Sequence, residues 1–243
     1  MTGRPAFATA VRVGRQLRHD PRTVVLLLAV PSLLLVLLRY MFNSKEYFQE
    51  LAPSLLAIFP LILMFLVTSI TTLRERTSGT LERLMAAPMA RLELIVGYAL
   101  AFGLVALVQS LLATVVSVLL GLDVGGIFGW VLVVAWADAL LGVALGLLAS
   151  AFARTEFQAI QFMPLVIFPQ LLLCGLFVAR DEMATLLYWI SYAMPLTYAV
   201  EALQRLVEDG GVGSGYFRDL LIVLACAAAG LVLAAGTLRR QTR

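Results

Sequence analysis

The sequence has little of the chemistry that enzymes use: one lysine, one histidine and two cysteines among 243 residues. A phosphate-binding P-loop needs a lysine directly after its glycines, whereas Lys45 follows Asn43-Ser44. The single histidine, His19, excludes histidine-based triads and multi-histidine metal sites. Cys174 and Cys226 lie in apolar runs, without metal-ligand spacing or a disulfide framework. We therefore expect no catalytic residue, bound cofactor or metal in this chain, and predict that it moves or anchors something.

Charge is also scarce, since charged residues make up 14% of the sequence and hydrophobic residues 61%, with a mean hydropathy of +0.95. Water-soluble domains are about a quarter charged, so this composition indicates an integral membrane protein. About twenty apolar residues cross a bilayer as a helix, and the runs lack the alternation of barrel strands. We predict an all-α polytopic protein with six transmembrane helices: Val24–Phe42, Pro53–Thr72, Leu94–Leu120, Phe128–Phe152, Ile160–Ala179 and Asp219–Leu238.

Basic residues are unequally distributed between the two sides that six spans define. Thirteen arginines fall on the side of both termini, whereas four arginines and Lys45 fall on the other side. Cytoplasmic segments of membrane proteins carry an excess of Lys and Arg, so we predict that both termini are cytoplasmic. The net charge of +3 then reflects topology, and we expect no nucleic-acid partner.

Residues 1–22 predict a basic helix that lies in the inner headgroup layer of the membrane. A cleavable signal peptide is the alternative, but Leu37–Phe42 offers no small-residue cleavage site. Within the expected helix, Phe7–His19, one face carries Phe7, Ala10, Val11, Gly14 and Leu17, and the other carries Arg12, Arg15 and His19.

A charged connector, Leu73–Pro88 (LRERTSGTLERLMAAP), separates the second and third spans. It cannot lie in hydrocarbon, so we expect residues 73–92 at the cytoplasmic membrane face. Ser78 or Thr80 can cap a short amphipathic helix that Pro88 ends, although an ordinary solvated turn is equally consistent with the spacing. The other residues of interest in this connector are Arg74, Glu75, Arg76, Gly79, Leu81, Glu82, Arg83, Leu84 and Met85.

Two polar residues lie near the middle of the third and fourth spans. Gln109 is sixteen residues, and Asp138 fourteen, from the predicted cytoplasmic end of its helix. At about 1.5 Å of rise per residue the two depths nearly match, so an interhelical hydrogen bond is possible. Asp138 is either a functional ionisable group or a protonated link between helices. Gly142 and Gly146 form a small-xxx-small pair that permits close packing.

The fifth span combines two prolines with amide side chains. Pro164 and Pro169 should leave backbone carbonyls unpaired and bend the helix, and Gln161 and Gln170 add polar groups. These features suit a helix that faces a pathway or a subunit interface. They also suit a helix that is buried against its neighbours.

The longest connection, residues 180–218, is predicted to lie outside the cell. Pro195 divides it into two mostly apolar stretches that are too short to cross a bilayer, which indicates two short re-entrant helices. One continuous seventh span is the alternative, but it would move the C-terminal arginines outside. The aromatic residues expected at the outer membrane–water interface are Tyr188, Trp189, Tyr192 and Tyr198. Glu201 and Arg205 are spaced for an i,i+4 ion pair on the second short helix.

Three motifs together resemble the ABC-2 type transporter permease family. The connector RERTSGTLERLMAAP is similar to the family's E-R-x-x-G-T-L-E-x-L-x-x-x-P pattern, and residues 153–164 and 194–203 are similar to two further family segments. The resemblance covers nearly the whole chain and is closest in style to daunorubicin-resistance and nodulation-factor exporters. It implies one transmembrane domain, residues 1–243, with an interfacial helix (1–22), a coupling helix and re-entrant helices (180–218).

The resemblance also implies partners that the chain itself does not supply. These are two copies of a separate P-loop ATPase, which would hold ATP and Mg, and a second permease that is expected to be identical. We expect a bacterial plasma-membrane exporter of amphipathic substrates, in which the ATPase displaces the connector helix around Gly79–Met85. The residues expected to couple to the ATPase are the ion-pairing Glu75, Arg76, Glu82 and Arg83 and the groove-filling Leu81, Leu84 and Met85, with Arg74 and Thr80 beside them. The alternatives are an exporter of lipid-linked polysaccharide or glycolipid, an ion-coupled carrier that uses Asp138, and an assembly subunit that transports nothing.

Overall fold

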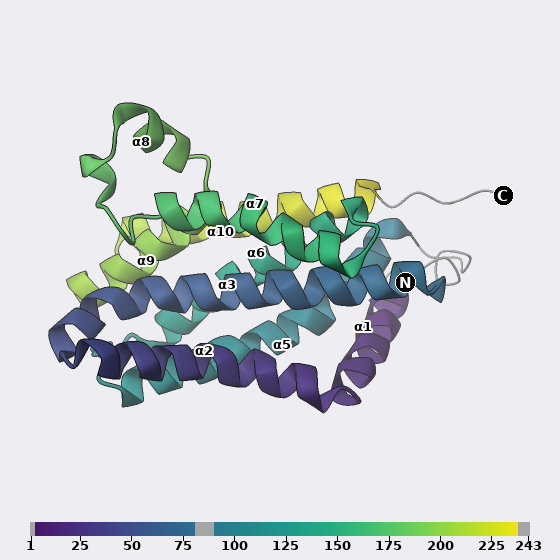
Figure 1. The fold of residues 1–243 in the computed structure, drawn as a ribbon, viewed down its shortest axis with the longest axis horizontal. Helices are drawn as coiled ribbons and strands as arrows, with labels where there is room; N and C mark the ends of the chain where they lie inside the picture. Colours follow the sequence, from purple (N-terminus) through teal and green to yellow (C-terminus); the bar gives the residue numbers. More distant parts are fainter. Residues whose placement is uncertain (1–2, 81–89, 238–243) are drawn as a thin grey trace.

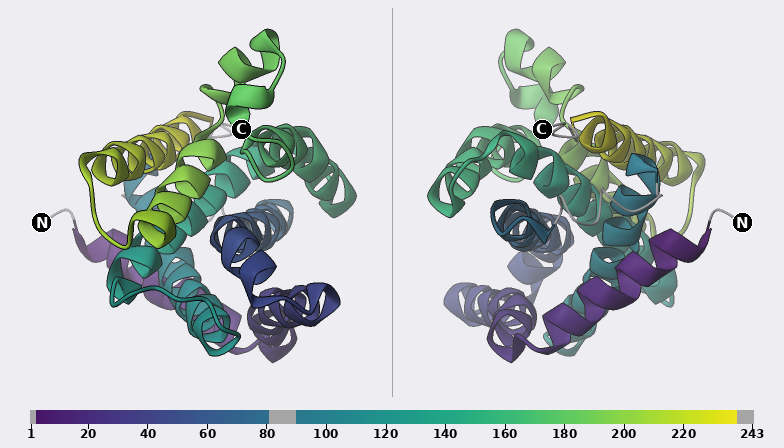
Figure 2. Two further views of the ribbon diagram at one scale, coloured as in Figure 1. Left: turned by 90° about the vertical axis from the view of Figure 1, so that its left-hand side faces the viewer. Right: turned by 90° about the vertical axis from the view of Figure 1, so that its right-hand side faces the viewer.

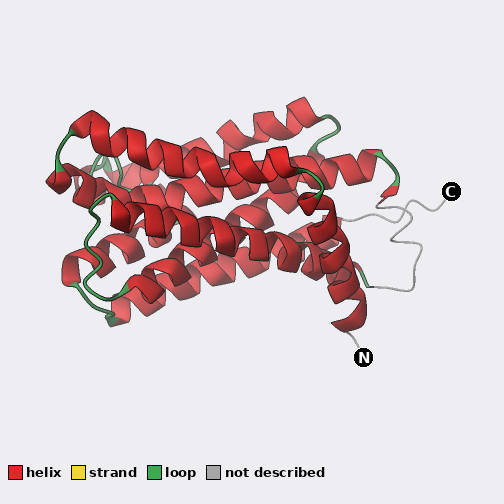
Figure 3. Cartoon of the chain, turned by 90° about the horizontal axis from the view of Figure 1, so that it is seen from below, coloured by secondary structure: helices red, strands yellow, loops and turns green. Residues whose placement is uncertain are grey.

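The chain forms an elongated bundle of helices (Figure 1). The structure, a computed structural model, describes residues 3–80 and 90–237, and within them it contains helices without strands (Figure 3). The predicted all-α class is therefore confirmed. The helices are α1 (Gly3–Arg18), α2 (Pro21–Phe42), α3 (Lys45–Thr77), α5 (Arg91–Leu119), α6 (Phe128–Phe152), α7 (Glu156–Leu173), α8 (Thr185–Ser191), α9 (Pro195–Asp209) and α10 (Ser214–Thr237), with a 3-10 turn η1 at Arg180–Glu182.

Six of these helices (α2, α3, α5, α6, α7 and α10) are long and apolar enough to cross a membrane, as predicted. The bounds of α6 agree with the prediction. However, α3 is longer than predicted, because Ser44 caps its start and the helix includes residues 45–52, which we had expected to form a loop. At its other end α3 runs to Thr77, so the first residues of the predicted connector belong to this helix.

The fifth predicted span ends too late. Helix α7 ends at Leu173 instead of Ala179, and Gly175 follows it with a φ of +92°. That left-handed conformation is open to glycine and turns the chain out of the helix. The helix nevertheless continues through Pro164 and Pro169.

Helices α3 and α6 pack closely at the centre of the bundle. An added Cβ on Gly142 would overlap the main-chain oxygen of Leu61, and one on Gly146 would overlap that of Phe65. The missing side chains therefore let two helix backbones approach, as the small-xxx-small pair predicts.

Helix α1 lies across one end of the bundle, and we call that end the α1 end (Figure 2, right). It packs on α5 where Gly97 leaves no room for a Cβ beside Ala6 and Thr9. The expected amphipathic helix is present, and it uses a neighbouring face to pack on the bundle, while the predicted membrane-facing residues Phe7 and Val11 stay exposed. Phe7 is 68% exposed, whereas the buried face is formed by Ala6, Thr9, Val13 and Leu17.

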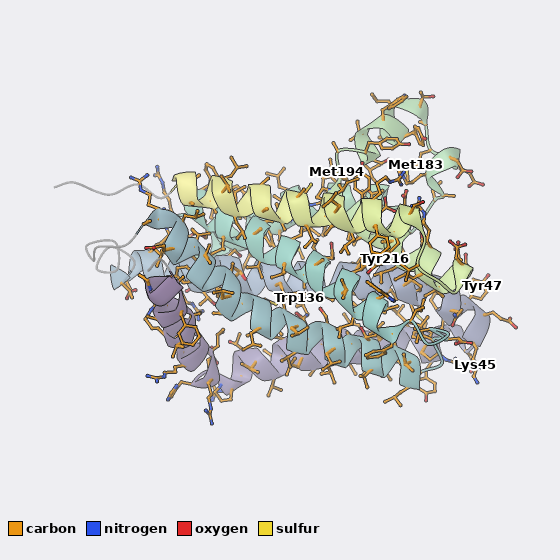
Figure 4. All side chains as sticks on the ribbon, turned by 180° about the vertical axis from the view of Figure 1, so that it is seen from behind. Lys45, Tyr47, Trp136, Met183, Met194 and Tyr216 are labelled. Carbon is orange, nitrogen blue, oxygen red and sulfur yellow. The ribbon has the colours of Figure 1, made fainter. Side chains whose placement is uncertain are left out.

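The opposite end carries α8, and we call it the α8 end. Lys45, Tyr47, Met183 and Tyr216 lie there, whereas Trp136 lies halfway along the bundle (Figure 4). Residues 174–194, including α8, stand away from the side of the bundle between α7 and α9 (Figures 1 and 2). The predicted division at Pro195 into two short helices is confirmed, since Pro195 is the first residue of α9.

Candidate functional site

The last turn of α3 lies at the α1 end and forms a junction between several helices. Glu75 in this turn is 3% exposed, and its carboxylate accepts hydrogen bonds from Arg12 Nη1 (3.0 Å) and Nη2 (2.8 Å). It also accepts a short hydrogen bond from the Tyr98 hydroxyl. Because Arg12 is on α1 and Tyr98 on α5, one buried carboxylate joins three helices. We call Arg12, Glu75 and Tyr98 the Glu75 cluster.

The Glu75 cluster is held by charge as well as by hydrogen bonds. Burial alone would lower the pKa of Arg12, but the hydrogen bond and the charge of Glu75 outweigh burial, so this pKa is raised. The Arg12 guanidinium also lies 5.9 Å from the centre of the Tyr98 ring. Arg12 therefore stays charged, and its bidentate contact with Glu75 fixes the orientation of α1 against the end of α3.

Two further arginines connect the same turn to other helices. Arg74 pairs with Glu156 at the start of α7, through Nε (2.7 Å) and Nη2 (2.9 Å), and both side chains are at least half exposed. Arg76 donates a short hydrogen bond to the main-chain oxygen of Ser150 near the end of α6. The final turn of α3 thus contacts α1, α5, α6 and α7 through polar groups.

The residues that follow α3 continue the connector. Ser78 is the first residue after α3, and its N–H donates to the Arg74 carbonyl at 3.0 Å. That Ser78 or Thr80 caps the connector helix stays a prediction, because residues 81–89 lie outside the described part of the chain. Gly79 has a φ of +72°, and the Ser78 and Thr80 hydroxyls lie 3.0 Å apart. Leu81, Glu82, Arg83, Leu84 and Met85 lie outside the described residues, so their predicted role stays a prediction.

The mid-depth polar residues are buried but do not bond to each other. Gln109 is 1% exposed and Asp138 is fully buried. Among the described residues neither side chain has a hydrogen-bond partner, so the interhelical bond that matching depths predicted is absent. Within the same part of the chain, no three His, Cys, Asp or Glu side chains are grouped to hold a metal ion.

The amides and prolines of α7 fall into two groups. Gln170 is buried and links helices, because its Oε1 accepts from the Leu196 N–H of α9 (3.3 Å) and its Nε2 donates to Val166 (3.0 Å). Gln161, Pro164 and Pro169 are exposed on the other side of α7. The helix is therefore buried on one face and open on the other.

The aromatic residues at the α8 end form a cluster around residues 174–194, which we call the excursion. The Tyr188 and Tyr192 hydroxyls lie 2.7 Å apart, and the Tyr198 hydroxyl donates to the Tyr192 carbonyl (2.8 Å). Trp189 is 66% exposed. The predicted pair of Glu201 and Arg205 is present at 3.1 Å. The cluster contains a second ion pair, Arg180 with Glu201, that sequence spacing did not indicate.

These features define a polytopic α-helical membrane protein whose second span ends in a polar junction. Residues 7–207 match the family model described as ABC-2 type transporter, so the chain belongs to that family. The three sequence motifs had indicated permeases of this family, including its daunorubicin-resistance members.

Individual relatives agree with this assignment. The chain is 27% identical over 192 residues to the probable multidrug ABC transporter permease YbhS of Escherichia coli (strain K12), covering 78% of this chain and 51% of YbhS. It is 26% identical over 258 residues to the daunorubicin resistance ABC transporter permease protein DrrB1 of Streptomyces coeruleorubidus, covering 94% of this chain and 85% of DrrB1. The chain thus spans about half the length of YbhS and most of DrrB1.

Proposed function

We propose that this chain is the permease subunit of an exporter that moves amphipathic, drug-like or lipid-like molecules and takes its energy from a separate ATPase. The observation that carries the proposal is the junction at the end of α3. This turn is the first part of the connector, and polar contacts join it to four other helices. A displacement of the connector would therefore reach most of the bundle at once.

In this mechanism the charged residues of the connector have two different tasks. Glu82 and Arg83 pair with the ATPase, while Leu81, Leu84 and Met85 fill a groove on it. Glu75 and Arg76, which the resemblance led us to expect in ion pairs with the ATPase, instead pass the motion on together with Arg74. Their side chains bond within the chain to Arg12, Ser150 and Glu156. Gly79 and Thr80 join the two groups. Two ATPase copies hold ATP and Mg and act on two identical permeases.

The proposed direction of transport rests on the family resemblance, and the charge asymmetry of the chain supports the orientation of the bundle. The excess of arginines favours a cytoplasmic α1 end in a bacterial plasma membrane. Substrate then enters from the inner leaflet and leaves at the α8 end, past Tyr188, Trp189, Tyr192 and Tyr198. Their amphipathic rings suit a cargo that has both polar and apolar parts.

A double substitution in the connector tests the coupling. Glu82→Ala with Arg83→Ala is expected to abolish substrate-stimulated ATP hydrolysis when the permease is purified with its ATPase, because the contact that carries the motion is lost. Arg91→Ala, at the start of α5, is the matched control and should retain stimulation. Intact assembly and intact stimulation in the double variant would contradict the coupling role.

One observation favours a second candidate, an ion-coupled carrier. Asp138 is fully buried, and its carboxyl oxygens have no hydrogen-bond partner in the described part of the chain, which is typical of proton-binding acids in membranes. Transport that persists without ATP, collapses with the proton gradient and is lost in Asp138→Asn would favour the carrier. Transport that requires ATP and survives Asp138→Asn would favour the exporter.

A further inference from the structure

An apolar groove of about 680 Å³ lies at the α8 end, between the second half of α7 and the excursion, and we call it the α7 groove. One wall is formed by α7 residues between positions 164 and 173, and the other by excursion residues between positions 178 and 187. Leu165, Phe168 and Leu172 are exposed, so the α7 wall is open to a ligand. Small-molecule sites are typically clefts of about 300–1,000 Å³ with an apolar lining and a few polar groups. The α7 groove has the size and the composition of such a site.

Among the residues that line the α7 groove, one is charged: Glu182, in the turn η1. Glu182 is exposed, and within the described part of the chain it belongs to no ion pair. Arg180, two residues earlier, pairs instead with Glu201 on the opposite side of the excursion, where Asp181 also lies. The α7 groove therefore contains one carboxylate whose charge no ion pair offsets.

The other polar features of the α7 groove also favour positive charge. Pro169 has no N–H, so the Leu165 carbonyl, four residues earlier, lacks the donor that an unbroken helix provides. Phe168, in the same wall, contributes an aromatic ring, and the face of such a ring attracts cations. None of the residues that line the groove has a side-chain hydrogen-bond donor. An anion would find nothing there to compensate for its desolvation, whereas a cation would find a carboxylate, a carbonyl and a ring.

We propose that the α7 groove binds a cationic amphiphile, with the apolar body of the molecule along α7 and its cationic group beside Glu182. A lipid tail or the apolar face of a second copy of this chain would cover the same wall, but neither requires a carboxylate. Glu182 would then be left as an unpaired charge at the edge of an apolar contact, which is unfavourable. The proposal names the class of cargo and so rests on the exporter function, but binding itself requires neither ATP nor the ATPase.

Two ions of similar shape and opposite charge test the proposal. Tetraphenylphosphonium and tetraphenylborate both carry four phenyl rings around a central atom, so an apolar wall alone does not favour the cation. Saturable binding to the full chain is measured by equilibrium dialysis in neutral detergent micelles, and binding to protein-free micelles is subtracted. We expect tetraphenylphosphonium to bind more tightly. Glu182→Gln should weaken its binding about fivefold, the effect of one exposed ion pair, and should not weaken the binding of tetraphenylborate.

Two further variants separate charge from contact area. Asp181→Asn is the matched control, because Asp181 is the adjacent exposed acid and lies on the opposite side of the excursion, so both affinities should stay unchanged. Phe168→Ala removes contact area and no charge. It should weaken tetraphenylphosphonium about fivefold in both the parent chain and the Glu182→Gln variant. All three parent side chains are exposed, so these changes should leave the fold intact.

Several outcomes would overturn the proposal: the absence of saturable binding, equal affinity for the two ions, or a preference for the cation that Glu182→Gln leaves intact or Asp181→Asn reduces as strongly. The groove would then be an apolar surface for lipid or for a second copy.

ATP hydrolysis by the permease purified with its ATPase separates this proposal from the exporter function. Binding that depends on Glu182, without stimulation of hydrolysis by tetraphenylphosphonium, would support the site and contradict its role in export. Stimulation that Glu182→Gln leaves intact would contradict the site and support the exporter.

Discussion

Glu75 shows how strongly the burial of one ion pair changes the role of a residue. The Glu75 side chain is 4% exposed, and its carboxylate accepts hydrogen bonds from Arg12 Nη1, Arg12 Nη2 and the Tyr98 hydroxyl. In the neighbouring pair, the Arg74 side chain is 59% and the Glu156 side chain 50% exposed. Breaking a buried ion pair leaves an uncompensated charge in the interior, whereas water solvates the charge that remains when an exposed pair is broken. Neighbouring charges in one motif therefore make very different contributions to stability.

This contrast predicts the stability of two variants. Glu75→Gln leaves Arg12 partly buried without an anionic partner, and we expect a loss of about 3 kcal/mol in the free energy of unfolding. Arg74→Gln, the matched control, should change it by less than about 1 kcal/mol. Equilibrium unfolding in mixed detergent micelles measures both values. The double variant Arg12→Gln/Glu75→Gln should recover part of the loss, and equal effects of the two single changes would contradict the argument.

The sequence predicted the membrane-embedded parts of the elements better than their ends. Apolar length located α6 correctly, because Gly126 and Arg154 each lie two residues beyond its ends and limit the apolar run. Apolar length missed residues 45–52 of α3, because their mixed charges resemble those of a loop. A helix outside hydrocarbon can contain such charges, and here Ser44 caps its start. Apolar length extended α7 too far because the residues after Gly175 are still apolar.

The candidate site was predicted only where its residues are neighbours in sequence. The spacing of Glu201 and Arg205 indicated their ion pair, whereas Arg12 is 63 residues from Glu75, so no periodicity relates them. Tyr98 was missed for a similar reason, since a tyrosine within an apolar run looks like a lipid-facing residue. Packing of α1 on α5, which brings these groups together, depends on the whole fold.

At the scale of helices, the close approach of α3 and α6 predicts the effect of a single methyl group. Gly142→Ala places a Cβ against the Leu61 carbonyl, which belongs to a rigid backbone, so the helices must separate. We expect a loss of about 1–3 kcal/mol in the free energy of unfolding. Gly129→Ala, on the same helix but in open space, should be neutral or slightly stabilising. A fully stable Gly142→Ala variant would show that the two helices are farther apart than described.

On the scale of the whole molecule, the two ends of the bundle differ in both charge and architecture. The α1 end carries the helix that crosses the bundle and the last turn of α3 with its polar contacts, whereas the α8 end carries residues 174–194, which stand away from the bundle (Figures 1 and 2). An exporter needs such a difference, because one end must receive energy and the other must release cargo. The proposed orientation assigns these tasks, and it is open to a direct test.

Labelling of single cysteines in intact cells tests the orientation. In a background with Cys174→Ala and Cys226→Ala, Gln16→Cys marks the α1 end and Glu46→Cys the α8 end; both parent side chains are exposed and neither is basic, so the arginine bias is preserved. A membrane-impermeant maleimide should label Glu46→Cys in intact cells, and Gln16→Cys only after lysis. The reverse pattern would put the connector outside, away from any source of ATP, and both the orientation and the coupling role would then be wrong.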